Sequence, residues 1–146
     1  MAREVTFDGD GCRFTLGVLR YEFADDARGA EANWLRGGVR VELSATGAFR
    51  CSVPVMLMAD ELSYFRDDLA RVLSRQKGVA TLDTEEDCVS LAVTVMPGSC
   101  SLAGYVKSEG FAVLNFEEIV TDEASLRGAH GQLVEVVREF PVRASA

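Results

Sequence analysis

A chain of 146 residues, of which 48% are hydrophobic, is long enough to bury the core of one domain. Its 23 acidic and 15 basic residues give a net charge of −8 and a pI near 4.7. This charge argues against nucleic acid as a partner, because a phosphate backbone would be repelled. The longest apolar stretch, residues 53–59, is far shorter than a membrane span, and the N-terminus has no signal-peptide pattern. We therefore expect a single cytoplasmic domain over residues 1–146, with no membrane or nucleic-acid partner.

The cysteines and the histidine predict neither a metal site nor a cofactor site. No two of the four cysteines form a C-x-x-C pair, and His130 is the only histidine. Each cysteine lies in an apolar or alternating run, where a free thiol behaves as a small buried hydrophobic group. This usage is typical of a reduced, cytoplasmic protein. The cysteines are Cys12, Cys51, Cys88 and Cys100.

The first part of the chain has the period-two pattern of β-strands. Strands are predicted over residues 5–7 and 12–23, joined by a turn rich in Gly and Asp. Residues 24–32 are small and polar, which predicts a loop or a short irregular helix. Two further alternating strands follow, around residues 39–43 and 49–55. Pro54 has no N–H to donate, so the second of these is predicted to be an edge strand or to end there.

A helix is predicted to begin near Asp60, where the apolar period changes to that of a helix. Asp60 is predicted to be its N-cap, and Gly78 is predicted to terminate it in the left-handed region. The apolar stripe consists of Leu62, Phe65, Leu69, Val72 and Leu73.

The second part of the chain repeats this order. Strands are predicted over residues 80–83, 88–96, 100–107 and 111–116, followed by a closing helix over residues 122–140 that Thr121 can cap. The fold class is therefore α+β. We expect mostly antiparallel sheet, about eight strands in two meander-like halves, with two amphipathic helices. The repeated order is also compatible with an internal duplication.

We find no catalytic motif in the sequence and predict that the protein is not an enzyme. A nucleophile needs an adjacent base, and His130 falls on the apolar stripe of the last helix, which favours a packed histidine. The acidic run over residues 83–87 has carboxylates that bind hard cations, but it lacks the spacing of an EF-hand loop and favours a solvated loop. A hydrolase built on two carboxylates is the alternative to this prediction.

The segment that includes the only tryptophan is the candidate binding site. It contains Asp25, Asp26, Glu31, Asn33 and Trp34. In one interpretation, Trp34 anchors this loop against the sheet. In the other, Trp34 is an aromatic hot spot and the acidic residues form part of a surface for a partner protein.

Several short motifs together resemble the WapI-like immunity-protein family and related actinobacterial proteins. They are the sequence Asn-Trp-Leu at 33–35 with the two strands after it, Asp-Glu-Leu at 60–62 opening a helix, and Phe-Pro-Val-Arg at 140–143. Family members are small cytosolic proteins, and the member that names the family neutralises the C-terminal nuclease toxin of a wall-associated contact-dependent weapon. The resemblance implies no catalytic residues.

The resemblance therefore implies a non-catalytic protein that binds a cognate toxin domain. An acidic domain is suited to covering the basic substrate channel of a nuclease, because opposite charges speed association. A small-molecule or carbohydrate-binding module is the alternative, favoured if the sheets enclose an apolar pocket. An oligomeric structural subunit is a further alternative, and the sequence does not predict the oligomeric state.

Overall fold

The computed structural model describes residues 3–23, 27–44, 47–110 and 112–143, which form eight strands and two helices with one short 3₁₀ helix. In chain order the first half contains β1 (Arg3–Gly9), β2 (Cys12–Tyr21), the 3₁₀ helix (Gly29–Asn33), β3 (Trp34–Leu43), β4 (Phe49–Met58) and α1 (Ala59–Arg75). The second half contains β5 (Gly78–Asp83), β6 (Val89–Met96), β7 (Ser99–Ser108), β8 (Ala112–Thr121) and α2 (Glu123–Glu139).

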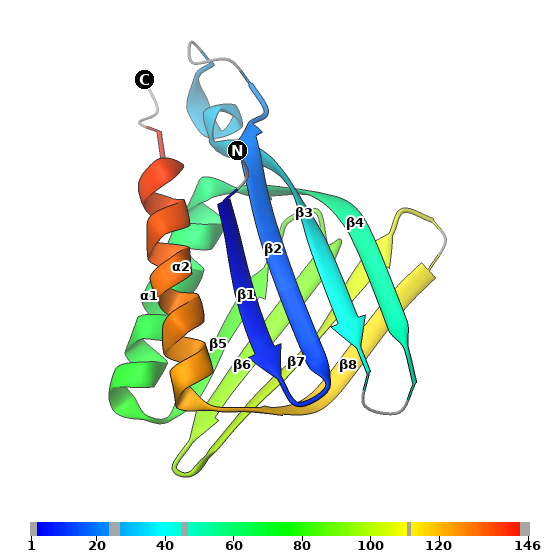
Figure 1. Ribbon diagram of the computed structural model, residues 1–146. Coiled ribbons are helices and arrows are strands. Elements are labelled where there is room, and N and C mark those ends of the chain that lie inside the picture. Colours follow the sequence, from blue (N-terminus) through cyan, green and yellow to red (C-terminus); the bar gives the residue numbers. More distant parts are fainter. Residues whose placement is uncertain (1–2, 24–26, 45–46, 111, 144–146) are drawn as a thin grey trace.

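The strands form two four-stranded antiparallel sheets, which confirms the predicted α+β class. Sheet A has the order β1-β2-β3-β4 and sheet B the order β5-β6-β7-β8, so each sheet is a simple meander. Both halves of the chain thus have four strands followed by a helix, as the repeated sequence order predicts. Figure 1 shows the two sheets stacked with their strands crossing, and the helices together at one side.

The core lies between the two sheets and the two helices. Alternate residues of β2 are buried, namely Cys12, Phe14, Leu16 and Val18, because a strand directs successive side chains to opposite faces. In sheet B the same alternation buries Leu91, Val93 and Val95 of β6. One connected cluster of buried residues joins both sheets to both helices.

The helices close one side of the stacked sheets. α2 packs along β1, α1 packs along β5, and the two helices pack against each other (Figure 1). Each helix thus lies beside the first strand of one sheet. β4 and β8 form the opposite edges of the two sheets, so the edge-strand prediction made from Pro54 is confirmed.

The helix ends differ from those predicted from the sequence. α1 begins at Ala59, and Met58 is its N-cap, with the Glu61 side chain accepting a hydrogen bond from the Met58 N–H at 2.6 Å. The prediction that Asp60 caps this helix is therefore wrong, because Asp60 already lies in the first turn. The predicted stop at Gly78 is wrong as well. The left-handed residue after the helix is Gln76, with φ of 55°, and Gly78 already begins β5.

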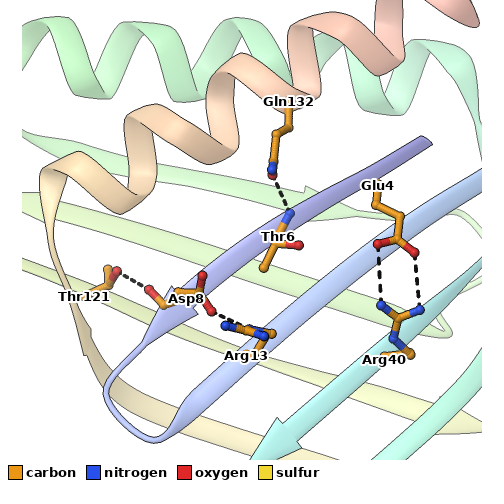
Figure 2. A network of polar contacts seen from close by, with 7 residues as sticks. All are labelled: Glu4, Thr6, Asp8, Arg13, Arg40, Thr121 and Gln132. Carbon is orange, nitrogen blue, oxygen red and sulfur yellow. Dashed lines mark hydrogen bonds and ion pairs between the residues drawn. The ribbon is translucent and has the colours of Figure 1, made fainter.

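The cap of α2 also differs by one residue from the prediction. Asp122 is the N-cap, and its side chain accepts a hydrogen bond from the Ser125 N–H at 2.7 Å. Thr121 ends β8 and donates its hydroxyl to the Asp8 carbonyl at 2.6 Å, as Figure 2 shows. Thr121 therefore joins the edge of sheet B to the β1–β2 hairpin and does not cap the helix.

Candidate functional site

The residues predicted as a binding site lie at the start of β3 and before it. Asp25 and Asp26 are outside the described residues. Glu31 is exposed in the 3₁₀ helix, Asn33 is buried at the end of that helix, and Trp34 is half-buried as the first residue of β3. The structure thus places the described members in one continuous segment, with Asn33 turned inward.

Asn33 holds the C-terminal segment against the body of the protein. Its side-chain oxygen accepts a hydrogen bond from the Arg143 N–H at 2.6 Å. The Tyr21 hydroxyl donates to the Pro141 carbonyl at 2.5 Å, and the Arg143 guanidinium lies over the Tyr21 ring at 3.4 Å. The motif around Asn33 and the motif at residues 140–143 are therefore in contact, although they are far apart in the sequence.

We expect Asn33→Ala to lower the free energy of unfolding by about 1–2 kcal/mol, because the Arg143 N–H loses its acceptor in a partly buried setting. Urea denaturation followed by circular dichroism measures the change. Asn115→Ala is the matched control, since Asn115 is exposed on β8, and it should change stability by less than about 0.5 kcal/mol. Equal effects of the two substitutions would contradict this role for Asn33.

Trp34 lies on the outer face of sheet A, close to a groove along β4. It is opposite Met58 in the β3–β4 register, and Arg36, two residues further on the same face, is opposite Met56. The Arg36 guanidinium pairs with both oxygens of the Glu22 carboxylate at 2.6 and 2.9 Å, and this pairing lowers the pKa of Glu22. Arg36 also lines the groove, so the predicted segment and the groove adjoin each other.

The groove has a volume of about 540 Å³ and follows the second half of β4. Its floor is β4 from Ser52 to Met56, and its walls are the β5–β6 turn and the β7–β8 turn. Beyond Arg36 and β4, the residues that line it are Glu86, Asp87, Cys88, Lys107, Ser108, Glu109 and Gly110. Sequence reasoning missed this site, although Pro54 marked β4 as an edge and the acidic run at 83–87 supplies one wall.

The acidic turn that forms one wall is held in place by Glu61. One carboxylate oxygen of Glu61 accepts from the Met58 N–H and the other accepts from the Glu85 N–H at 2.7 Å. Burial raises the pKa of Glu61, while the two backbone hydrogen bonds act in the opposite direction. Within the turn, the Asp87 N–H donates to the Thr84 carbonyl at 3.0 Å. The N-terminus of α1 therefore positions the acidic turn beside β4.

Asp87 is neutralised by neighbours from β7. The Tyr105 hydroxyl donates a hydrogen bond to one oxygen of Asp87, and the Lys107 ammonium pairs with the other at 2.9 Å. These contacts lower the pKa of Asp87, and the carboxylate raises the pKa of Tyr105 to about 12. Asp87 thus stays ionised and Tyr105 stays protonated at neutral pH.

Two carboxylates of the groove remain without a counter-ion. Arg36 pairs with Glu22 and Lys107 pairs with Asp87, which accounts for both cations of the groove. Among the described residues, Glu86 and Glu109 have no ion-pair partner, and both are exposed. The free charge of the groove is therefore negative, above a floor that includes Val53, Pro54 and Met56.

The outer face of sheet A differs, because two of its carboxylates form ion pairs within the face. Figure 2 shows Glu4 beside Arg40 at 3.3 Å and Asp8 beside Arg13 at 2.7 Å. Residues 1–58 contain seven basic and eight acidic side chains, whereas residues 59–146 contain eight basic and 15 acidic ones. The acidic excess of the chain thus belongs almost entirely to its second half, which supplies both walls of the groove.

The described residues contain no group of three or more His, Cys, Asp or Glu side chains arranged to hold a metal ion. Burial raises the pKa of all four cysteine thiols, that of Cys12 to about 11, which keeps them protonated and poorly nucleophilic at neutral pH. The Nε2 atom of His130 is buried with no hydrogen-bond partner in the described part of the chain.

The fold resembles that of a solved protein of different sequence. The structure of the plant transcriptional regulator PBF-2 matches with a TM-score of 0.55 at 12% identity, covering 96% of this chain and 82% of that chain. At this identity the likeness shows a shared fold only. No curated protein sequence matches this chain significantly.

Two further results concern the class of protein. Neither helix, within the described residues, has the length and apolar character needed to cross a membrane. The model of the WapI-like immunity protein family matches residues 5–141, which is nearly the whole chain and includes both sheets, both helices and the groove. The chain therefore belongs to the WapI-like immunity protein family.

Proposed function

We propose that this protein is a non-catalytic immunity protein that neutralises a cognate toxin domain by binding it directly in the cytoplasm. Family membership over residues 5–141 supports the class of function. The groove along β4 supports the location of the binding surface, since it combines an apolar floor with the free carboxylates of Glu86 and Glu109. Apolar anchors contribute affinity, and unpaired surface charge contributes speed and specificity of association.

The charge of the groove favours a basic toxin domain, as expected for a nuclease. A nuclease binds a polyanion through a basic surface, and the acidic second half of this chain is complementary to such a surface. Trp34 extends this proposed surface, because it shares the outer face of β3 with Arg36 at the groove, and Glu31 is exposed in the segment just before it. Asp25 and Asp26 stay candidate binding residues on the sequence alone. Asn33 precedes Trp34 but is buried, and its side chain accepts the hydrogen bond from the Arg143 N–H.

A toxin domain encoded beside this gene tests the proposal. Cells that express the domain should survive when they also express this protein, and the purified proteins should form a complex that weakens as salt rises. We expect the double reversal Glu86→Lys with Glu109→Lys to lower the association rate at least about tenfold at low salt, because both free charges of the groove change sign. Stopped-flow mixing measures this rate.

The control variant reverses two exposed carboxylates that do not line the groove, Asp10→Lys with Glu117→Lys. It changes the net charge by the same amount, so any effect of overall charge is equal in the two variants. If both variants slow association equally, the groove is not the contact surface. If the protein neither binds the domain nor protects the cells, the proposed function itself is wrong.

The groove volume also favours one alternative function. About 540 Å³ falls within the range of roughly 300–1,000 Å³ typical of small-molecule sites, as a small-molecule or carbohydrate-binding module would require. Calorimetric titration with a panel of mono- and oligosaccharides tests this alternative. Saturable binding that is lost in the double reversal at Glu86 and Glu109 would favour the module over the toxin inhibitor.

A further inference from the structure

The two sheets are covered unevenly. α2 packs along β1 and α1 packs along β5, so the helices cover the first-strand side of both sheets. On the other side, β4 ends sheet A and, in the described part of the chain, pairs with β3 alone (Figure 1). Residues 49–54 of β4 are exposed or only half-buried. An edge strand of this kind presents backbone groups on which another strand can form.

Pro54 indicates which backbone groups of β4 face outward. In an antiparallel pair, the N–H and C=O groups of alternate residues point to the same side. Pro54 has no N–H and is opposite Gly38 in the register, so we place it at a position that faces away from β3. Arg50 and Ser52 have the same parity as Pro54, and their N–H and C=O groups therefore face the free edge.

Two hollows adjoin each other along β4. A second hollow of about 230 Å³ lies beside the first half of β4, and it shares Val53 and Ser108 with the groove of about 540 Å³. Together the two hollows follow β4 from Phe49 to Met56, a length of roughly 26 Å at about 3.3 Å per residue. A groove that follows one edge strand matches the shape of an extended segment.

The groove has different chemistry at its two ends. At the end near Phe49 it is lined by apolar side chains, with Phe49 58% and Val113 53% exposed. Arg50 is the one cation among the described residues that line this second hollow. At the end near Met56 it passes between the free carboxylates of Glu86 and Glu109. An occupant with an apolar side chain at one end and Lys or Arg at the other would satisfy both ends.

We propose that β4 is the docking strand of this protein. An extended, basic segment of the toxin domain adds to the free edge at Arg50 and Ser52 and continues past Pro54 between Glu86 and Glu109. This inference rests on the proposed function and specifies the binding mode. A second copy of the chain is a poorer occupant, because it would bring more acidic groups to the groove of a chain whose net charge is −8.

Ser52→Pro tests the docking strand directly. It removes an N–H from the free edge, and an edge strand tolerates proline where that N–H faces away from its neighbour. We expect the affinity for the toxin domain encoded beside this gene, measured by calorimetry, to fall at least about tenfold. Ser52→Ala is the matched control, because it removes the same side chain but keeps the N–H, so the expected loss of affinity is counted between the two variants.

Hydrogen exchange gives a second readout that needs no variant. In the complex, the amides of Arg50 and Ser52 should become protected, and the toxin peptide protected at the same time should contain Lys or Arg. If the toxin domain binds without this protection, or binds Ser52→Pro as tightly as Ser52→Ala, the proposal that β4 is the docking strand is wrong. The proposed function would still stand. Protection in the free protein that grows with its concentration would instead identify a second copy as the occupant. Failure of the unaltered chain to bind would overturn both.

Discussion

Replacement of Phe14 by Ala should lower the free energy of unfolding by about 3–5 kcal/mol, the range for loss of a buried aromatic ring. Phe14 is fully buried on β2, at the centre of the contact between the two sheets. Its ring lies 6.3 Å from that of Phe7 in an edge-to-face arrangement and 6.2 Å from that of Phe116 on β8. Its removal leaves a cavity between sheets A and B that rigid strands refill only in part.

Equilibrium denaturation in urea measures this loss, and Phe49→Ala serves as the control. Phe49 is the same residue type on the same sheet, but its side chain is 58% exposed, so its truncation should change stability by about 0.5 kcal/mol or less. A loss at Phe14 no larger than that at Phe49 would show that the sheets do not depend on this ring for their contact.

Replacement of Gly104 by Ala should destabilise the protein by roughly 3 kcal/mol, at the upper end of the range for overpacking. Gly104 lies on β7 where the register with β8 shifts. An added Cβ would lie 2.1 Å from the Ser90 carbonyl oxygen and 3.1 Å from the Phe116 ring. A backbone oxygen in a strand has no rotamer to relieve the contact, so β6 and β7 must separate.

Gly131→Ala is the matched control for Gly104→Ala, and its effect on stability should have the opposite sign. Gly131 is exposed on α2, and nothing lies within 4 Å of an added Cβ. Alanine should therefore stabilise the helix by about 0.5–1 kcal/mol, since glycine has the greater freedom to lose on folding. Thermal unfolding of both variants measures the difference. If both substitutions shifted the melting temperature in the same direction, the close approach of β6 and β7 at Gly104 would be contradicted.

The strands were predictable because each half of the chain alternates between apolar and polar residues. In β2 and β6 this alternation is nearly uninterrupted, and the structure buries the expected side chains. β3 begins five residues earlier than the pattern around 39–43 suggested, since Gly37 and Gly38 hide the alternation there. The apolar stripe of α1 predicted that helix equally well, because burial of one face is a local property of the sequence.

The helix caps were less predictable because they depend on which side chain the fold places within hydrogen-bonding distance of the free backbone groups. Asp60 has the residue type of an N-cap, but Glu61 satisfies the Met58 N–H and the Glu85 N–H together. Thr121 also has a capping side chain, but it donates to Asp8 from a distant hairpin. Both contacts, to Glu85 and to Asp8, join segments that are distant in the sequence, so the local sequence does not predict them.

For the candidate site as well, the sequence predicted separate features but not their assembly. The sequence identified the acidic run at 83–87, interpreted mainly as a solvated loop with a surface for a basic partner as the alternative, and the edge strand around Pro54. It did not predict that these two features form one site. The structure brings them together, with the β7–β8 turn as the other wall of one groove. Asn33 and residues 140–143 were likewise recognised as separate motifs, and their contact is a result of the fold.

The sequence by itself determined the class of this protein: its acidity, its two meander-like halves, its helices and its resemblance to an immunity family. These properties follow from composition and from periods of two and 3.6 residues, which act over a few neighbours. The tertiary structure alone decided which edges the helices cover, which carboxylates remain unpaired and which motifs touch. Those outcomes depend on contacts between residues distant in sequence, such as Asp87 with Lys107 or Asn33 with Arg143, and only packing of the two sheets and helices selects them.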